Sequence, residues 1–424
     1  MIIGLVFAVL SGATLWGVLR AAGLTRGERW FPRVIMGGFV LRLLIQFVIR
    51  DVPFFSHGLG GDSAGYEAAA QAIAQYWTHS GVHFVTSSEM ADLGPTSLPA
   101  NVFALIIYLN GGDVSRLGCT AVVALAAALT VINIYTLAIQ LGAKQKDALL
   151  LATLFFFQPA FLFYTSDTYK DGLVLCFTIG AFGSALRLSL RLSVVHLVIG
   201  VLSVAALWFV RFYLLSVAIA PLIVGIVGLG GKGVTRSVVA ALVLGTGLLA
   251  LAGFTDILQL ASSRAAETFD LATSQRVLGS NSEGGSGVTF DDGGSPFGAL
   301  PAKLMYTIFS PFPWSAGSLG FQLGKVDAFL WYFMLYRAAR AARTVDKRVL
   351  LMVATFVLPS TLMYAMSMAN VGLIVRQRLI IVAAVAILAS LWSPKKQETK
   401  TRAQDAISRL PRHPRRPVRR NQAA

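Results

Sequence analysis

Residues 118–141, GCTAVVALAAALTVINIYTLAIQL, decide the fold class of this chain. The stretch carries no charged side chain, and it is longer than the roughly 20 residues that a helix needs to cross a lipid bilayer. Similar apolar runs recur along the 424 residues, of which 55% are hydrophobic and only 13% are charged. Lipid offers backbone groups no partners, and the runs lack the alternation of barrel strands, so we predict an all-α, polytopic transmembrane helical bundle.

Eleven stretches have the length and hydropathy of transmembrane helices. They cover residues 2–21, 33–50, 118–141, 148–166, 172–190, 194–210, 212–229, 237–254, 325–341, 349–367 and 376–393. Basic residues collect at alternate ends of these stretches, around Arg26, Lys144, Arg187, Lys232 and Arg340. Because Lys and Arg are enriched on the cytoplasmic side, we predict an inner (plasma) membrane protein with an extracytoplasmic N-terminus and a cytoplasmic C-terminus.

Residues 1–394 are predicted to form one transmembrane domain with two long extracytoplasmic loops, 51–117 and 255–324. Residues 395–424 form a separate tail, in which ten basic residues accompany two acids and three prolines between Lys395 and Arg420. This composition predicts a disordered cytoplasmic segment. Because the tail follows a terminal span, we expect it to bind anionic lipid headgroups and not nucleic acid.

Charged residues gather at the predicted outer ends of the spans and in the two outer loops. They are Asp62, Asp167, Lys170, Asp171, Arg211, Arg264, Arg276, Lys303, Arg376 and Arg378. Basic residues on this face oppose the usual topological bias, and binding the phosphate of a lipid-linked substrate is a natural reason for them. Arg42 is different, because it lies within the second predicted span. We expect it to pair with a neighbouring helix.

Asp62, Tyr66 and Ala70 follow the second predicted span at intervals of four residues, so a helix would place all three on one face. Asp62 would begin this helix, where the macrodipole favours a carboxylate. The pattern D-x-x-x-Y-x-x-x-A in a first outer loop resembles the GT-C superfamily of membrane glycosyltransferases, particularly its protein mannosyltransferase and aminoarabinose transferase branch. The resemblance covers residues 60–77. Other outer stretches resemble those of membrane proteins from bacterial polysaccharide gene clusters, namely Tyr169–Gly172, Ser310–Trp314 and Asn370–Arg378.

The resemblance implies a GT-C-like bundle with a juxtamembrane helix on its outer side. It also implies a glycosyltransferase that moves a sugar from a polyprenyl-phosphate carrier to a glycan or lipid acceptor, with Asp62 as the catalytic base. The residues predicted to bind the substrate are Tyr66, Lys170, Asp171, Arg211, Arg376 and Arg378. No cofactor and no metal site is predicted. Ser63 follows Asp62 where that branch commonly has a second acid, so use of a divalent cation, for which Asp291 and Asp292 are candidate ligands, stays open.

Arg376 and Arg378 are two residues apart, so on a helix their side chains would diverge by about 200°. We therefore expect only Arg376 to face the donor, and Arg378 to pair elsewhere.

Two other functions remain alternatives. A polysaccharide polymerase of the O-antigen type would depend on Arg264 and Arg276 more than on Asp62. A non-enzymatic transporter or flippase of lipid-linked sugars would need charged residues along a path through the membrane, where Arg42 stands almost alone.

Overall fold

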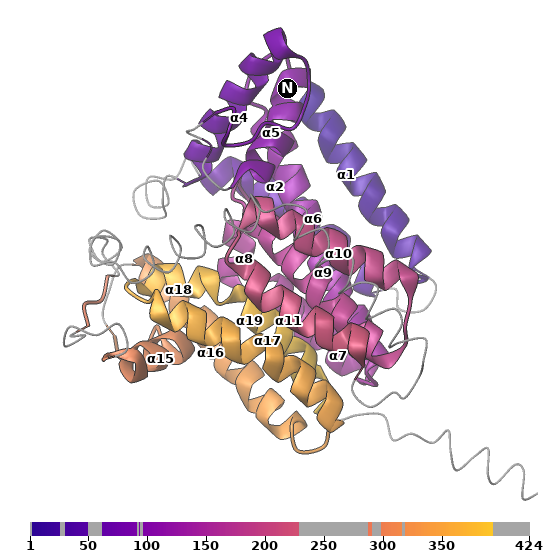
Figure 1. Cartoon of the computed structure of the whole chain (residues 1–424), viewed down its shortest axis with the longest axis vertical. Helices are drawn as coiled ribbons and strands as arrows, with labels where there is room; N and C mark the ends of the chain where they lie inside the picture. Colours follow the sequence, from indigo (N-terminus) through magenta and orange to yellow (C-terminus); the bar gives the residue numbers. More distant parts are fainter. Residues whose placement is uncertain are drawn as a thin grey trace, which may run out of the picture.

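The computed structural model describes residues 2–25, 30–49, 62–90, 93, 96–228, 287–290, 298–315 and 319–392. Within these residues the chain is 79% helical and contains no strand, which confirms the prediction of an all-α fold. The helices are α1 (Ile2–Ala21), α2 (Trp30–Ile49), α4 (Asp62–Ser80), α5 (Ser97–Leu109), α6 (Arg116–Gln140), α7 (Gln145–Phe156), α8 (Pro159–Tyr164), α9 (Asp171–Leu190), α10 (Val194–Val210), α11 (Leu214–Val227), α15 (Leu300–Phe309), α16 (Leu319–Ala341), α17 (Lys347–Met366), α18 (Val371–Gln377) and α19 (Leu379–Ser390). Figure 1 shows their arrangement.

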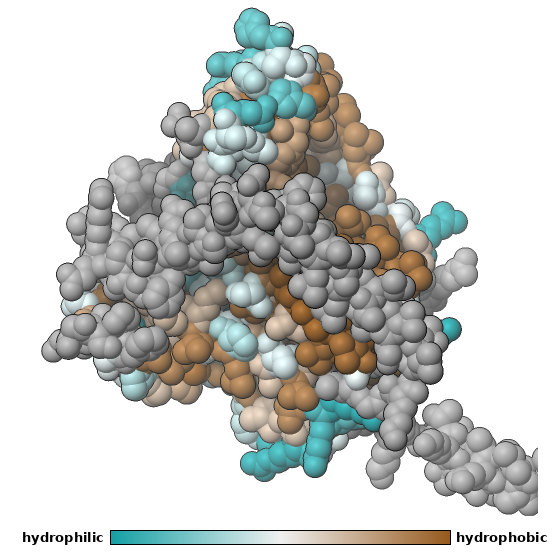
Figure 2. Space-filling view, viewed as in Figure 1, coloured by the Kyte–Doolittle hydropathy of each residue, from teal (hydrophilic) through white to brown (hydrophobic). Residues whose placement is uncertain are grey.

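The protein is embedded in a membrane. Among the described residues, α1, α2, α6, α9 and α17 are long and apolar enough to cross a bilayer, and α18 with α19 makes a sixth span if this bent pair is counted as one. Apolar side chains of α1 point away from the bundle, with Ile2 77% and Val9 62% exposed. Figure 2 shows an apolar surface along this helix. Such a surface is unfavourable in water and suits contact with lipid.

The prediction of eleven spans is not confirmed. Predicted span 148–166 is broken into α7 and α8, because Pro159 begins a new helix where its missing N–H is not needed. Predicted span 376–393 corresponds to α18 and α19, which meet at an angle of 49°. Helices α10 and α11 have only 17 and 14 residues. Predicted span 237–254 lies outside the described residues.

The first predicted outer loop contains two helices. Helix α4 begins at Asp62, as the spacing of Asp62 and Tyr66 predicts. Helix α5, which was not predicted, packs along α4. Trp77 of α4 and Phe103 of α5 are buried in a small hydrophobic cluster of their own. Figure 1 shows this helix pair projecting from one end of the bundle, so Asp62 begins a well-packed element.

The second predicted outer loop is described only at residues 287–290 and 298–315, where α15 forms. Residues 288 and 369 are joined by a backbone hydrogen bond of 2.8 Å, which ties this segment to the residues that precede α18. The predicted tail, 395–424, lies outside the described residues.

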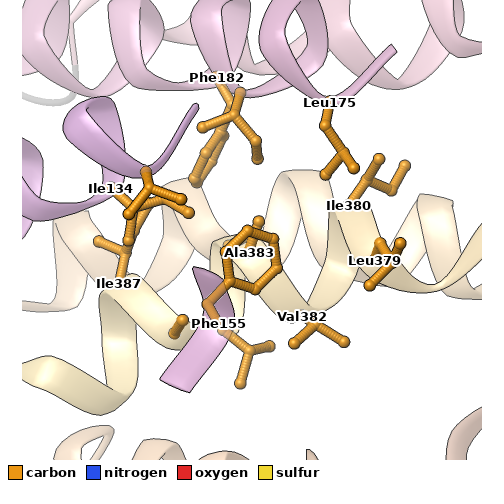
Figure 3. Close-up of a cluster of buried hydrophobic side chains, with 14 of the residues drawn as sticks. Ile134, Phe155, Leu175, Phe182, Leu379, Ile380, Val382, Ala383 and Ile387 are labelled. Atoms are coloured by element: carbon orange, nitrogen blue, oxygen red, sulfur yellow. The ribbon is translucent and has the colours of Figure 1, made fainter. Parts of the chain in front are cut away.

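The centre of the bundle is built around α9 and α19. Helix α9 packs against α6, α10 and α11, and α19 packs against α6, α7, α9 and α16. Every residue of α19 is buried. Figure 3 shows Ile134 of α6, Phe155 of α7 and Phe182 of α9 meeting Ala383 and Ile387 of α19. The short helix α18 leads directly into this central helix, so its side chains are held at a defined place.

Arg42, fully buried in α2, donates hydrogen bonds that stabilise the break between α7 and α8. Its Nη2 donates a hydrogen bond to the carbonyl oxygen of Phe156 (2.7 Å), and its Nε donates one to Thr165 Oγ1 (2.7 Å). Phe156 ends α7, and the last carbonyls of a helix have no partner within it. Arg42 therefore pairs with neighbouring helices, as predicted, and anchors the segment that leads to Lys170.

Candidate functional site

The central feature of the candidate site is the guanidinium of Arg376 in α18, which lies between two carboxylates. Its Nη1 donates a hydrogen bond to Asp62 Oδ2 (2.6 Å). Its Nε donates one to Asp171 Oδ2 (2.8 Å), and its Nη2 lies 2.6 Å from the same oxygen. Asp62 is the first residue of α4 and Asp171 is the first residue of α9. The site therefore joins the outer helix pair to the core of the bundle.

Asp171 is the buried anchor of this cluster. Its side chain is 3% exposed and also faces Arg211, whose Nη2 lies 3.9 Å from Asp171 Oδ1. A buried carboxylate is strongly unfavourable unless it is paired, and here two arginines and the start of α9 neutralise it. Breaking this arrangement by removing one partner would leave the other buried charge uncompensated.

The first turn of α9 lies unusually close to α6. A Cβ atom at Gly172 would come within 2.7 Å of the backbone oxygen of Val123, closer than real Cβ contacts allow. Only glycine permits this approach. Because Asp171 precedes Gly172, the contact between α9 and α6 also determines where the buried carboxylate lies.

Aromatic rings surround the charges. The guanidinium carbon of Arg376 lies 4.9 Å from the ring centroid of Tyr164 and 5.2 Å from that of Tyr169. The ammonium nitrogen of Lys170 lies 5.4 Å from the ring centroid of Tyr66. Rings at this distance attract cations, which helps to hold the Arg376 guanidinium and the Lys170 ammonium in place.

Two groups of the site titrate in unusual ranges. Burial, with a contribution from the positive charge of Arg211, lowers the pKa of Lys170 to about 7. Burial, with a contribution from the negative charge of Asp62, raises the pKa of Tyr66 to about 12. At neutral pH, Tyr66 therefore keeps its hydroxyl proton and can donate it in a hydrogen bond. Lys170 is close to the point where it gains or loses a proton.

A second contact holds α4 on the bundle. Glu67 is buried, and its Oε1 accepts a hydrogen bond from Thr168 Oγ1 (2.9 Å). Its Oε2 lies 3.6 Å from Arg116 Nε. Glu67 was not among the predicted site residues, although a carboxylate directly before Ala68 in an apolar stretch is itself a signal. Glu67 anchors the helix independently of Asp62.

Arg378 does not join the cluster. Its Nη1 donates hydrogen bonds to the carbonyl oxygens of Thr307 (3.2 Å), Ile308 (3.1 Å) and Ser310 (2.8 Å). These carbonyls belong to the last residues of α15 and the residue that follows it, so Arg378 caps a helix end. Arg376 and Arg378 therefore diverge, as the spacing predicts, and Arg378 contacts the end of α15 and not the cluster.

Of the predicted site residues, the structure thus brings together Asp62, Tyr66, Lys170, Asp171, Arg211 and Arg376. Arg264, Arg276, Asp291 and Asp292, which belong to the polymerase and cation alternatives, lie outside the described residues. In the described part of the chain there is no group of three or more His, Cys, Asp or Glu residues that could hold a metal ion. The positive charge between the Asp62 and Asp171 carboxylates is the guanidinium of Arg376.

The cluster combines a solvent-facing carboxylate, two buried guanidiniums, an amine and a phenol hydroxyl. Guanidiniums and amines bind phosphate, and a carboxylate can accept a proton. Compared with known protein families, curated proteins and solved structures, the chain matches none.

Proposed function

We propose that the protein is a membrane glycosyltransferase that moves a sugar from a polyprenyl-phosphate donor to a glycan or lipid acceptor. The observation that carries this proposal is the meeting of Asp62, Lys170, Asp171, Arg211 and Arg376, of which Asp62 and Arg376 are 314 positions apart. We further propose that the protein is GT-C-like around Asp62 and that the chain crosses the membrane about eleven times. The site would lie on the extracytoplasmic face of the inner membrane. The proposal also includes a basic cytoplasmic tail at anionic lipids.

In the proposed reaction, the acceptor oxygen bonds to the anomeric carbon of the donor sugar. The bond from that carbon to the phosphate oxygen breaks, and the phosphate keeps the electron pair. Asp62 takes the proton of the acceptor hydroxyl as general base. Arg376 and Arg211, with protonated Lys170, neutralise the charge that develops on the phosphate.

The contacts of the buried arginines favour this function over a transporter. A path for a charged headgroup would need polar groups that are free to solvate it. Arg42 and Arg378 instead bind backbone oxygens at the ends of α7 and α15. These charges stabilise helix ends, whereas in the described part of the chain the cluster around Arg376 combines carboxylates, guanidiniums and an amine.

The test is turnover by the purified protein in lipid nanodiscs, supplied with short-chain prenyl-phosphate sugars and membrane glycan acceptors. We expect transfer that falls by about 10²- to 10⁴-fold in Asp62→Asn, because the amide keeps the shape of the side chain but cannot take up a proton. Near-normal transfer by Asp62→Asn would overturn the assignment.

The matched control is Asp147→Asn. Asp147 also pairs with an arginine, Arg337, at 2.5 Å. Arg337 contacts Ala389 near the far end of α19, a helix about 18 Å long, whereas Arg376 precedes its start. This variant releases an arginine without touching the site, so its turnover should remain close to that of the wild type.

A further inference from the structure

The two carboxylates that bind Arg376 are not equivalent. Asp171 is 3% exposed and faces a second arginine, whereas Asp62 is 52% exposed. Its contact with Arg376 is the only ion pair of Asp62 in the described part of the chain. Water can hydrate the Asp62 carboxylate when it leaves Arg376, whereas the buried Asp171 carboxylate would lose the charge that compensates it. Of the two carboxylates, Asp62 is therefore the one that can leave Arg376 at the lower cost.

The anchoring of α4 allows this movement. Glu67 holds the helix through Thr168 and Arg116, and Trp77 is packed in the cluster shared with α5. None of these contacts involves the side chain of Asp62. The carboxylate can therefore turn away from Arg376 by rotation about its own side-chain bonds while α4 stays in place.

The proposed reaction requires such a separation. In an inverting displacement, the acceptor approaches one face of the sugar and the phosphate leaves from the other, so the base and the group that binds the phosphate lie on opposite sides. Asp62 Oδ2 and Arg376 Nη1 are only 2.6 Å apart, which leaves no room for a sugar between them.

We propose that Asp62 occupies the anion-binding position of Arg376 in the resting protein, and that the donor phosphate displaces it. Arg376 keeps Asp171 through its Nε and Nη2, and its Nη1 passes from Asp62 to a phosphate oxygen. Displacement frees the Asp62 carboxylate to accept a proton only after the donor has bound. This inference rests on the proposed function and adds the order of its steps: the donor binds first, and only then can Asp62 act as the base.

The inference predicts that removing the charge of Asp62 strengthens anion binding. We expect Asp62→Asn and Asp62→Ala to bind farnesyl phosphate about two- to fivefold more tightly than the wild type, as calorimetric titration into nanodiscs would show. Farnesol, which lacks the phosphate, should bind all variants alike. Asp147→Asn is the control that releases an arginine elsewhere and should bind like the wild type.

Each outcome has a distinct meaning. Unchanged or weaker binding of farnesyl phosphate by both Asp62 variants, with turnover lost, overturns the displacement and leaves the proposed function standing. Tighter binding with turnover retained supports displacement and overturns Asp62 as the base. Failure of the wild type and of every variant to bind farnesyl phosphate overturns both.

Discussion

The carboxylate of Asp327 in α16 accepts hydrogen bonds from the backbone nitrogen of Ala160 at the start of α8, at 3.0 and 3.1 Å. This acid is the counterpart of Arg42 at the end of α7 and Arg378 at the end of α15. Negative charge is placed at a helix start and positive charge at helix ends, as the helix dipole requires. Helices that stop inside the protein need such partners, because burial shields their end groups from solvent.

Replacing Asp327 with leucine should therefore destabilise the protein by about 1–3 kcal/mol, because the Ala160 N–H would stay buried without an acceptor. Thermal unfolding in detergent, followed by tryptophan fluorescence, measures the change. Asp346→Ala is the control, since Asp346 caps α17 at an exposed position and accepts a hydrogen bond from Arg348 N (2.8 Å). A smaller loss in Asp327→Leu than in Asp346→Ala would contradict the role assigned to burial.

Gly172→Ala should lower both stability and anion binding. The added methyl group would lie 2.7 Å from Val123 O, so α9 must shift, and Asp171 shifts with it. We expect a loss of about 1–3 kcal/mol in unfolding free energy, together with weaker binding of farnesyl phosphate. Gly17→Ala in α1, where a Cβ atom meets nothing within 4 Å, should leave both quantities nearly unchanged. Equal behaviour of the two variants would show that the close approach is unimportant.

Arg376→Lys and Arg378→Lys should have different effects. Lysine at position 376 keeps the charge but cannot reach Asp171 and a phosphate together, so farnesyl phosphate should bind about 10- to 100-fold more weakly. Lysine at position 378 loses contacts with the end of α15, which should lower the melting temperature and leave affinity intact. Calorimetric titration and thermal unfolding of both variants separate these effects. The pattern would be refuted by a similar loss of affinity in both variants.

Anion binding should depend on pH through Lys170. Its pKa of about 7 is below the usual value for lysine, and a bound phosphate would raise it again. Above pH 7, the binding of each phosphate would then be accompanied by the uptake of one proton from solution by Lys170, so affinity should fall by up to about tenfold per pH unit. Below pH 7, Lys170 is already charged and the curve should flatten.

The measurement uses a prenyl phosphodiester, whose own charge is constant between pH 6 and pH 9. In Lys170→Arg the charge is permanent, so the slope above pH 7 should disappear. A slope that persists in this variant would assign the proton to another group.

The proposed orientation can be tested by labelling single cysteines in intact cells, after Cys119 and Cys176 are replaced by alanine. Val82 follows α4, and Thr344 lies between α16 and α17; both are exposed. An impermeant maleimide should label Val82→Cys, while Thr344→Cys should react only after permeabilisation. The reverse result would place the Arg376 cluster on the cytoplasmic side and remove lipid-linked donors of the outer face from consideration.

The sequence alone was enough to identify the helical, membrane-embedded character of the protein, because lipid excludes any backbone that does not satisfy its own hydrogen bonds. It also predicted the start of α4 at Asp62, since a four-residue spacing is a local property of helices. The number of spans was harder to predict from the sequence. Hydropathy averages over windows, so it does not detect a break such as the one before Pro159, where Arg42 and Asp327 supply partners from distant helices.

The tertiary structure decided which candidate residues meet. Helical spacing predicted that Arg376 and Arg378 diverge, but it did not give their partners. The packing of α18 against α8 and α15 places Arg376 at Asp62 and Asp171 and places Arg378 at the end of α15. The unequal burial of Asp62 and Asp171 is likewise absent from the sequence. Composition and periodicity are local, whereas an ion pair between residues 314 positions apart depends on how every helix between them packs.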